Sequence, residues 1–162
     1  MAHDDIFDIL KADHDRHRTL IARLEKSAAG SPERESLFEE LTLELKAHAA
    51  AEEQSLYAST MRHPDLTGST RHSVAEHHEI EESLNDLAAT AMDSDDWLAK
   101  FKALAHRYTH HIEEEEEEHF PEFAADLDDA EADRIRRIFE ERKPAEKQAA
   151  EITPEPKEEA KE

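Results

Sequence analysis

Apolar residues recur along this chain with the period of an α-helix, in four long segments and one shorter segment. We therefore expect helices at about residues 4–28, 32–61, 69–92, 95–120 and 128–142. Glycine, which weakens helices, occurs at two positions in the whole chain. The pattern predicts an all-α fold without strands.

Residues with known preferences for helix ends support these boundaries. Gly30–Pro32 places glycine after one helix, serine as the cap of the next, and proline at its first position. Asp128 has a glutamate three residues later, which is the spacing of a capping box with aspartate as the cap. Pro121 disfavours helical geometry in the residue before it, so we expect the fourth helix to end near Phe120.

Four helices of similar length with short connections predict an up-down-up-down antiparallel four-helix bundle. This domain would comprise residues 1–143 and include the short fifth helix. From about Pro144 the chain contains proline, glutamate, lysine and alanine without apolar periodicity. We therefore expect a disordered acidic tail over residues 144–162.

Charge and composition exclude several classes of protein. The formal net charge is -22, so we expect neither nucleic acid nor an anionic membrane surface as a partner. Cysteine is absent, which excludes disulfides and thiolate metal ligands. No segment resembles a signal peptide or a membrane span, so we expect a soluble, cytoplasmic protein.

Each long helix has a histidine on its predicted buried face. These residues are His14, His48, His77 and His111. His111 continues a seam of large apolar residues, namely Trp97, Phe101, Leu104 and Tyr108. We prefer His77 and His111 to their neighbours His78 and His110, because the neighbours align with the polar side of each helix.

Three of these histidines are followed four residues later by a glutamate, at Glu52, Glu81 and Glu115. Residues at this spacing project from one helix face, one turn apart. A buried carboxylate without a partner costs on the order of several kcal/mol, and a metal ion is its simplest partner. A single buried histidine is more often an ordinary hydrogen-bonded residue, but the joint pattern favours a metal site. Its nitrogen and oxygen ligands suit iron or manganese.

Three further residues have two interpretations each. His17 lies one turn beyond His14 and is either a hydrogen-bonded core histidine or an extra metal ligand. His119 lies one turn beyond Glu115, where we expect it either to be exposed or to contact a metal ligand without binding the metal itself. Tyr57 is expected to pack in the core, and the alternative is a hydrogen bond to a metal-bound oxygen.

At these positions the sequence resembles the hemerythrin family, in its bacterial HHE cation-binding branch. The matching segments are residues 12–15, 48–53 with 56–57, 76–80, and 110–115 with 120–121, and the resemblance spans about residues 4–123. It implies a four-helix bundle that holds an oxo- or hydroxo-bridged non-haem diiron centre. Ferritin-like carboxylate proteins are a rival class, but they require Glu-x-x-His on two helices, and here only Glu116 to His119 has that spacing.

The resemblance also implies a role for each ligand. It assigns His14 and His48 to one iron ion, and His77, Glu81 and His111 to the other. Glu52 and Glu115 would bridge the two ions. Glu81 stands where oxygen-carrying members have a histidine, and its added negative charge favours ferric over ferrous iron.

The leading functional hypothesis is a hemerythrin-like diiron protein that binds O2, peroxide or NO in sensing, scavenging or delivery. We expect a dry core that admits a small diatomic and excludes a large substrate. One alternative is a catalase-like or peroxidase-like diiron enzyme, with His17 as an acid–base residue. Another is an iron storage or iron-sensing protein. No nucleophile–base pair or phosphate loop supports a hydrolase or a kinase, and we assign no catalytic residue.

Overall fold

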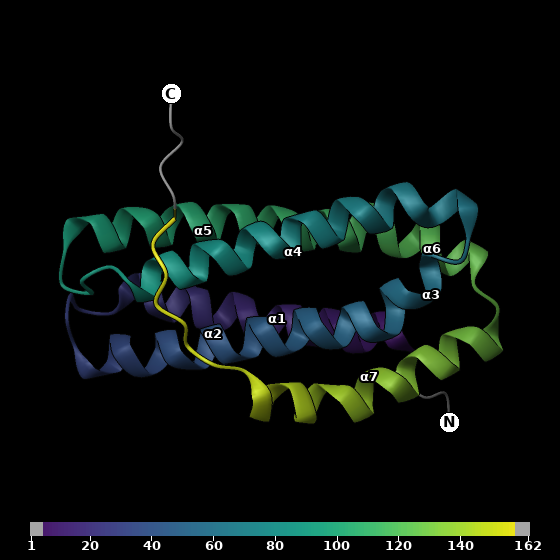
Figure 1. Ribbon diagram of the computed structural model, residues 1–162, viewed down its shortest axis with the longest axis horizontal. Coiled ribbons are helices and arrows are strands. Elements are labelled where there is room, and N and C mark those ends of the chain that lie inside the picture. Colours follow the sequence, from purple (N-terminus) through teal and green to yellow (C-terminus); the bar gives the residue numbers. More distant parts are fainter. Residues whose placement is uncertain (1–4, 158–162) are drawn as a thin grey trace.

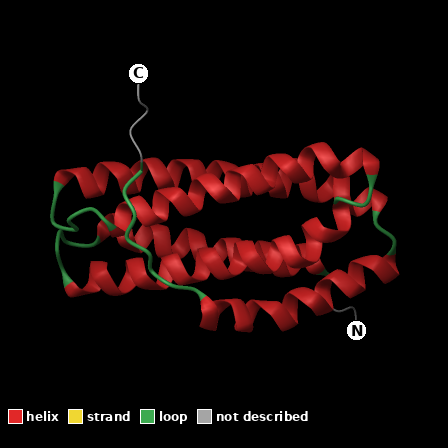
Figure 2. Cartoon of the chain, in the orientation of Figure 1, coloured by secondary structure: helices red, strands yellow, loops and turns green. Residues whose placement is uncertain are grey.

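The computed structural model describes residues 5–157, and within this range it is helical with no strand (Figure 2). The all-α class is therefore confirmed. The α-helices are α1 (Ile6–Lys26), α2 (Pro32–Glu52), α3 (Ala58–Thr60), α4 (Thr67–Ala88), α5 (Asp95–Glu114), α6 (Phe120–Asp126) and α7 (Asp129–Ala149). Two π-helical turns, η1 (Glu53–Tyr57) and η3 (Glu115–His119), and one 3-10 turn, η2 (Pro64–Leu66), join some of them.

The helices α1, α2, α4 and α5 lie side by side, and consecutive ones run in opposite directions (Figure 1). α1 packs against α2 and α5, and α4 packs against α5 and α2, so the four helices surround a common interior. α7 lies along the outside of α2 and makes an extensive contact with it. Across residues 5–157, no helix combines the length and the apolar character that crossing a bilayer requires.

The predicted helix caps are present. Gly30 has a φ of 66°, in the left-handed region that glycine adopts without strain, and it follows α1. The side chain of Ser31 accepts a hydrogen bond from the backbone N–H of Arg34 at 3.1 Å. Asp128 accepts one from the N–H of Glu131 at 2.7 Å. Each such cap stabilises a helix by about 1 kcal/mol.

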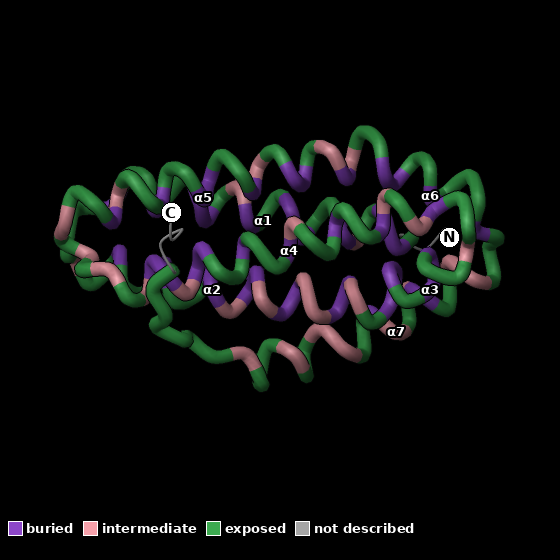
Figure 3. Tube along the Cα trace, turned by 45° about the horizontal axis from the view of Figure 1, so that its top comes forward, coloured by how far each residue is buried: buried purple, intermediate pink, exposed green. Residues whose placement is uncertain are grey.

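Buried residues lie on the inner faces of the helices (Figure 3). The apolar ones form two clusters. One cluster contains Trp97 and Phe101, and the other contains Leu56 and Phe120. Between the clusters, the inner faces carry polar side chains. In α1, for example, the buried His14 lies between Leu10 of one cluster and Leu20 of the other.

The prediction that the fourth helix ends before Pro121 was wrong. α5 passes into the π-helical turn η3, and α6 then begins at Phe120, so the backbone remains helical through Pro121. Proline lacks a backbone N–H, but in the first turn of a helix that group would have no intrahelical acceptor. The π-helical turn has already interrupted the regular hydrogen-bond pattern at this point.

The predicted end of the fifth helix was also too early. α7 continues through Pro144 to Ala149, although its last turns carry few apolar residues. Ion pairs hold them instead: the Lys143 ammonium lies 2.8 Å from a carboxylate oxygen of Asp13, and that of Lys147 lies 2.6 Å from Glu44. Composition alone does not show these pairings.

The segment after α7 contacts α4, contrary to the prediction of disorder from residue 144 onward. The backbone N–H of Glu155 donates to the carbonyl of Asn85 at 3.0 Å. The Lys157 ammonium donates to the hydroxyl of Ser83 at 2.8 Å. Residues 158–162 of the predicted tail lie outside the described residues.

Candidate metal centre

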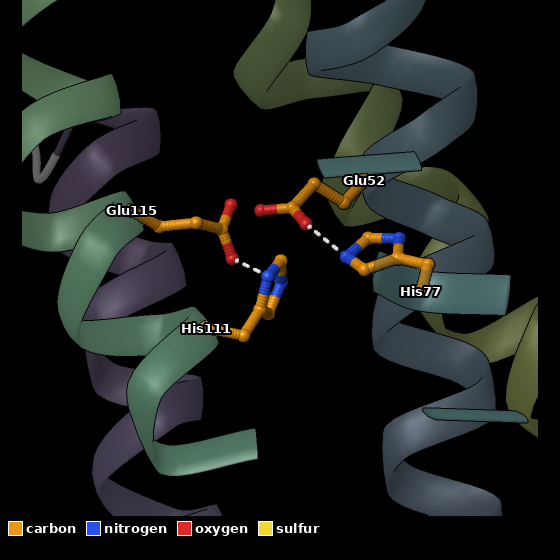
Figure 4. Close-up of side chains that lie close together, drawn as sticks. All are labelled: Glu52, His77, His111 and Glu115. Carbon is orange, nitrogen blue, oxygen red and sulfur yellow. Dashed lines mark ion pairs between the residues drawn. The ribbon is translucent and has the colours of Figure 1, made fainter. Parts of the chain in front are cut away.

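Six of the seven predicted ligands come together in the polar layer between the two apolar clusters. One group consists of Glu52, His77, His111 and Glu115, whose ligand atoms all lie within 4.8 Å of one another (Figure 4). A second group, by the same criterion, consists of His14, His48 and Glu52. All six side chains are buried, and Glu52 belongs to both groups.

The two glutamates lie between histidines of different helices. Nε2 of His77 is 3.1 Å from Oε1 of Glu52, and Nε2 of His48 is 3.9 Å from Oε2 of the same residue. Oε1 of Glu115 is 2.9 Å from Nε2 of His111 and 3.7 Å from Nε2 of His14. Each carboxylate therefore faces one histidine of each group, as a bridging ligand does.

Several ligand atoms in this layer have no hydrogen-bond partner among the described residues. They are Nε2 of His14, His48 and His111, both oxygens of Glu52 and Oε1 of Glu115. A buried polar atom without a hydrogen-bond partner lowers the stability of a fold by about 1–3 kcal/mol. Cations between these atoms would satisfy all of them at once. Two ligand groups that share one carboxylate fit a pair of first-row metal ions.

Three further carboxylates bind the outer ring nitrogens of the histidines. Nδ1 of His14 lies 2.7 Å from Glu116. Nδ1 of His48 lies 2.9 Å from Asp13. Nδ1 of His111 lies 2.9 Å from Glu76. A carboxylate accepts and does not donate when ionised, so each Nδ1 carries the proton and each Nε2 presents its lone pair to the centre.

Sequence analysis did not find these three supporting carboxylates. Each is adjacent in sequence to a predicted ligand: Asp13 precedes His14, Glu76 precedes His77, and Glu116 follows Glu115. An acidic neighbour of a buried histidine or glutamate was therefore the available signal. It was weak, because acidic residues are frequent throughout this chain.

The pKa values show that, without a cation, protons would neutralise the cluster. Burial raises the pKa of Glu52 to about 7, and the nearby Glu115 carboxylate adds to the effect. Burial opposes protonation of His77, but contacts with Glu52 and Glu53 outweigh it and raise its pKa to about 9. For His111, burial is outweighed by Glu115 and Glu76, and its pKa rises to about 10. A cation would take the place of these protons.

Tyr57 does more than pack in the core. Its hydroxyl donates a hydrogen bond to Oε2 of Glu115 at 2.8 Å, which leaves Oε1 directed at His111. Burial, together with the Glu115 carboxylate, holds the pKa of Tyr57 well above its usual value, so the phenol keeps its proton. Tyr57 is thus buried in an apolar cluster, as expected, and its hydroxyl also bonds a predicted metal ligand, Glu115.

The structure places His17 as a hydrogen-bonded core residue. Burial lowers its pKa, so the ring is neutral at pH 7. Nε2 lies 3.3 Å from a carboxylate oxygen of Glu44, to which it donates, and Nδ1 therefore accepts from the hydroxyl of Tyr108 at 2.7 Å. With both ring nitrogens in use, His17 has none left for a metal ion.

The prediction that Glu81 faces inward was wrong, because its side chain is exposed on α4. Four residues advance an α-helix by about 400°, so successive residues at that spacing drift about 40° around the axis. The buried stripe of α4 instead passes through Ser73, His77, Ile80, Leu84 and Leu87. Val74, seven residues before Glu81 on the same helix, is also exposed, at 37%.

His119 is buried, which contradicts the expectation that it is exposed, and it lies outside the central cluster. Its Nδ1 lies 3.0 Å from the hydroxyl of Ser73, and its Nε2 lies 3.3 Å from Oε1 of Glu114. The residue therefore faces a separate group of acidic and imidazole side chains on α4, α5 and η3.

A pocket of about 660 Å³ opens between α2 and α4, and His48, His77 and Tyr108 form part of its wall. Its other lining residues include the apolar side chains of Leu45 and Leu84. The pocket is larger than a diatomic molecule requires, and it falls in the usual size range of small-molecule sites. The two histidines in its wall are only 2% and 7% exposed, so the pocket reaches the edge of the buried cluster.

These features define a class of protein: a helical protein with a buried histidine–glutamate cluster suited to cations. Residues 5–123 match the sequence model of the Hemerythrin HHE cation binding domain. The chain therefore belongs to this family, which confirms the resemblance noted from its motifs.

Among solved structures, the fold is similar to that of a hemerythrin HHE cation binding domain-containing protein from Mycobacterium kansasii. The TM-score is 0.78 at 22% sequence identity, and the match covers 91% of this chain and 90% of that one. A similarity at this identity shows a shared fold. Among curated proteins, none matches the chain.

Proposed function

We propose that the chain is a non-haem diiron protein with the helical arrangement of a hemerythrin-type four-helix bundle. His14 and His48 would bind one iron ion, and His77 and His111 the other. Glu52 and Glu115 would lie between the two ions. The observation that carries this proposal is the set of buried ligand atoms without hydrogen-bond partners, which converge from four helices on one volume.

Two iron ions in this position would supply redox-active binding of O2, NO or peroxide. The chain itself orients the ligands and keeps water out. Asp13, Glu76 and Glu116 hold the outer nitrogens of three histidines, so their Nε2 atoms stay directed inward. The Tyr57 hydroxyl fixes one oxygen of Glu115, and the apolar clusters close the layer at both ends. We propose a role in sensing, scavenging or delivery of such a small ligand.

A second candidate is a redox enzyme that acts on peroxide. The pocket between α2 and α4 favours it, because molecules larger than a diatomic can approach His48 and His77. Oxygen release from hydrogen peroxide, measured on the iron-loaded chain, separates an enzyme from a ligand-binding protein. Full turnover in a His17→Ala variant would remove that residue from the mechanism.

Reconstitution tests the diiron proposal directly. The metal-free chain is loaded with ferrous iron under nitrogen and then exposed to air. We expect about two iron ions per chain, as two ligand groups imply, and a ligand-to-iron charge-transfer absorption in the near ultraviolet. Anomalous scattering at the iron edge should show two peaks, on either side of Glu52.

Parallel loading with manganese and competition between the two metals test the choice of iron. A chain that binds at most one iron ion per molecule, or binds manganese in preference to iron, would contradict the proposal. Glu81→Gln serves as a control, because this exposed residue lies outside the cluster.

A further inference from the structure

We propose that the chain has a second, outer site for a divalent first-row metal ion, on α4, α5 and η3. Its ligands are His72, Glu76, Glu114, Glu118 and His119. His72 and Glu76 are on α4, Glu114 ends α5, and the other two belong to η3. Nitrogen and oxygen ligands of this kind suit Fe²⁺, Mn²⁺ or Zn²⁺.

Two groups of possible ligands meet at this place. Single ligand atoms of His72, Glu76 and Glu114 lie within 4.8 Å of one another, and the same holds for Glu114, Glu118 and His119. Glu114 belongs to both groups, as Glu52 does in the inner cluster. The arrangement joins imidazoles and carboxylates from two neighbouring helices, and so differs from a simple run of surface acids.

Two imidazole nitrogens converge on a single oxygen of Glu114. Nε2 of His72 is 2.8 Å from Oε1 of Glu114, and Nε2 of His119 is 3.3 Å from the same atom. Nε2 of His72 also lies 3.2 Å from Oε1 of Glu76. A cation among these atoms would be held by nitrogen and oxygen ligands from both helices.

The environment of His119 is an independent indication of a ligand. The residue is 6% exposed, and the hydroxyl of Ser73 engages its Nδ1 at 3.0 Å. Nε2 makes no hydrogen bond among the described residues and is directed at Glu114 and Glu118. A buried imidazole with one nitrogen fixed by a neighbour and the other aimed at two carboxylates matches the way in which proteins orient metal-binding histidines.

The π-helical turn explains why these residues meet. Glu114 and His119 are five residues apart, and in a regular α-helix this spacing turns a side chain about 140° away from the first. A π-helix pairs residue i with residue i+5, so η3 brings His119 back over Glu114. The helical periodicity of the sequence therefore did not reveal this cluster.

Glu76 connects the outer site to the inner one. The same oxygen, Oε1, lies 3.2 Å from Nε2 of His72 and 2.9 Å from Nδ1 of His111. An ion at the outer site would share the carboxylate that orients an inner ligand. For this reason Glu76 is unsuitable for a test that must leave the inner centre intact.

The test uses the full-length, iron-loaded chain and Zn²⁺ as a probe, with calorimetric titration and metal analysis. The double variant His72→Ala/Glu118→Gln removes two exposed ligands of the outer site. The control variant His78→Ala/Glu82→Gln removes an exposed pair on α4, whose Nε2 and Oε1 atoms are 2.7 Å apart. Within residues 5–157, this pair belongs to no group of three possible metal ligands. Thermal melting verifies that both variants fold.

We expect the unmodified chain and the control variant to bind one Zn²⁺ ion in addition to iron. The His72/Glu118 variant should bind it at least about tenfold more weakly, with unchanged iron content. Absence of the extra ion in the unmodified chain, equal losses in both variants, or unaltered binding in the His72/Glu118 variant would overturn the proposal. Both variants keep every ligand of the inner cluster, so the difference in Zn²⁺ binding between them reports on the outer site whatever the inner cluster holds. Failure here is therefore distinguishable from failure of the diiron proposal, which the iron content measures.

Discussion

The imidazole of His111 contacts the carboxylate of Glu115 without forming a hydrogen bond. Nε2 and Oε1 are 2.9 Å apart, yet neither atom has a hydrogen-bond partner among the described residues. Without a cation, a proton on the imidazole makes this contact an ion pair, and a cation bound between the two atoms would take the place of that proton. The other ligand atoms of the cluster are placed in the same way, buried and directed at one another.

The first prediction concerns the two central glutamates. Glu52→Gln and Glu115→Gln keep the side-chain shape but remove the charge, so each should reduce bound iron from about two ions per chain to at most one. Glu81→Gln should leave the iron content unchanged, because that side chain is exposed. Metal analysis after desalting measures all three. Equal iron content in the three variants would remove the two glutamates from the centre.

The second prediction concerns Asp13, which holds Nδ1 of His48 at 2.9 Å. Asp13→Asn should weaken metal binding by about 10–100-fold, the usual effect of losing such a supporting carboxylate. Asp15→Asn is a matched control, because Asp15 is exposed and pairs with Arg18 at 2.9 Å. Competition with a chelator gives the affinities. If the two variants bind metal equally well, Asp13 does not support the ligand.

The third prediction concerns the hydroxyl of Tyr57, which donates to Glu115 at 2.8 Å. Tyr57→Phe should lower the free energy of unfolding of the metal-free chain by about 1.5–3 kcal/mol, because the bond is made to a buried carboxylate. Tyr108→Phe removes a hydroxyl that is bonded to the neutral His17, and its cost should be nearer to about 1 kcal/mol. Urea unfolding provides both values, and the reverse order would contradict this account.

The fourth prediction concerns pH and the Glu44 carboxylate. A hydrogen bond from His17 holds the pKa of Glu44 well below its usual value of 4.5, and Lys147 adds to the effect against the opposing burial. Because the folded-state pKa lies below the unfolded one, the ionised group stabilises the fold above pH 4.5. That stabilisation is lost progressively as the pH falls below this value.

Glu44→Gln should therefore lower the free energy of unfolding at neutral pH, and its difference from the unmodified chain should shrink as the solution is acidified. Urea unfolding of the metal-free proteins between neutral and acidic pH measures this difference. Glu40→Gln, at an exposed position on the same helix, should show no such trend. A difference that stays constant with pH would show that Glu44 does not titrate in this way.

The helices and much of the centre could be predicted from the sequence because both depend on periodicity within single helices. His77 and His111 are buried and their neighbours His78 and His110 are exposed, as the apolar stripes indicated. The central seam of α5 is buried from Trp97 to Glu115 at each predicted position. A buried stripe selects which of two adjacent residues faces the core, and that choice requires no knowledge of the other helices.

The tertiary structure decided which side chains meet across helices. The exposure of Glu81 depends on where α2 and α5 press against α4, and the spacing of residues on α4 does not contain that information. The pairing of Asp13 with His48, and of Glu76 with His111, joins residues 35 positions apart in each case. The sequence by itself determined the helices and the inward histidines, because local geometry sets them. Only packing between helices determined the partners, because contacts between distant residues depend on the rotation of each helix and on the π-helical turns.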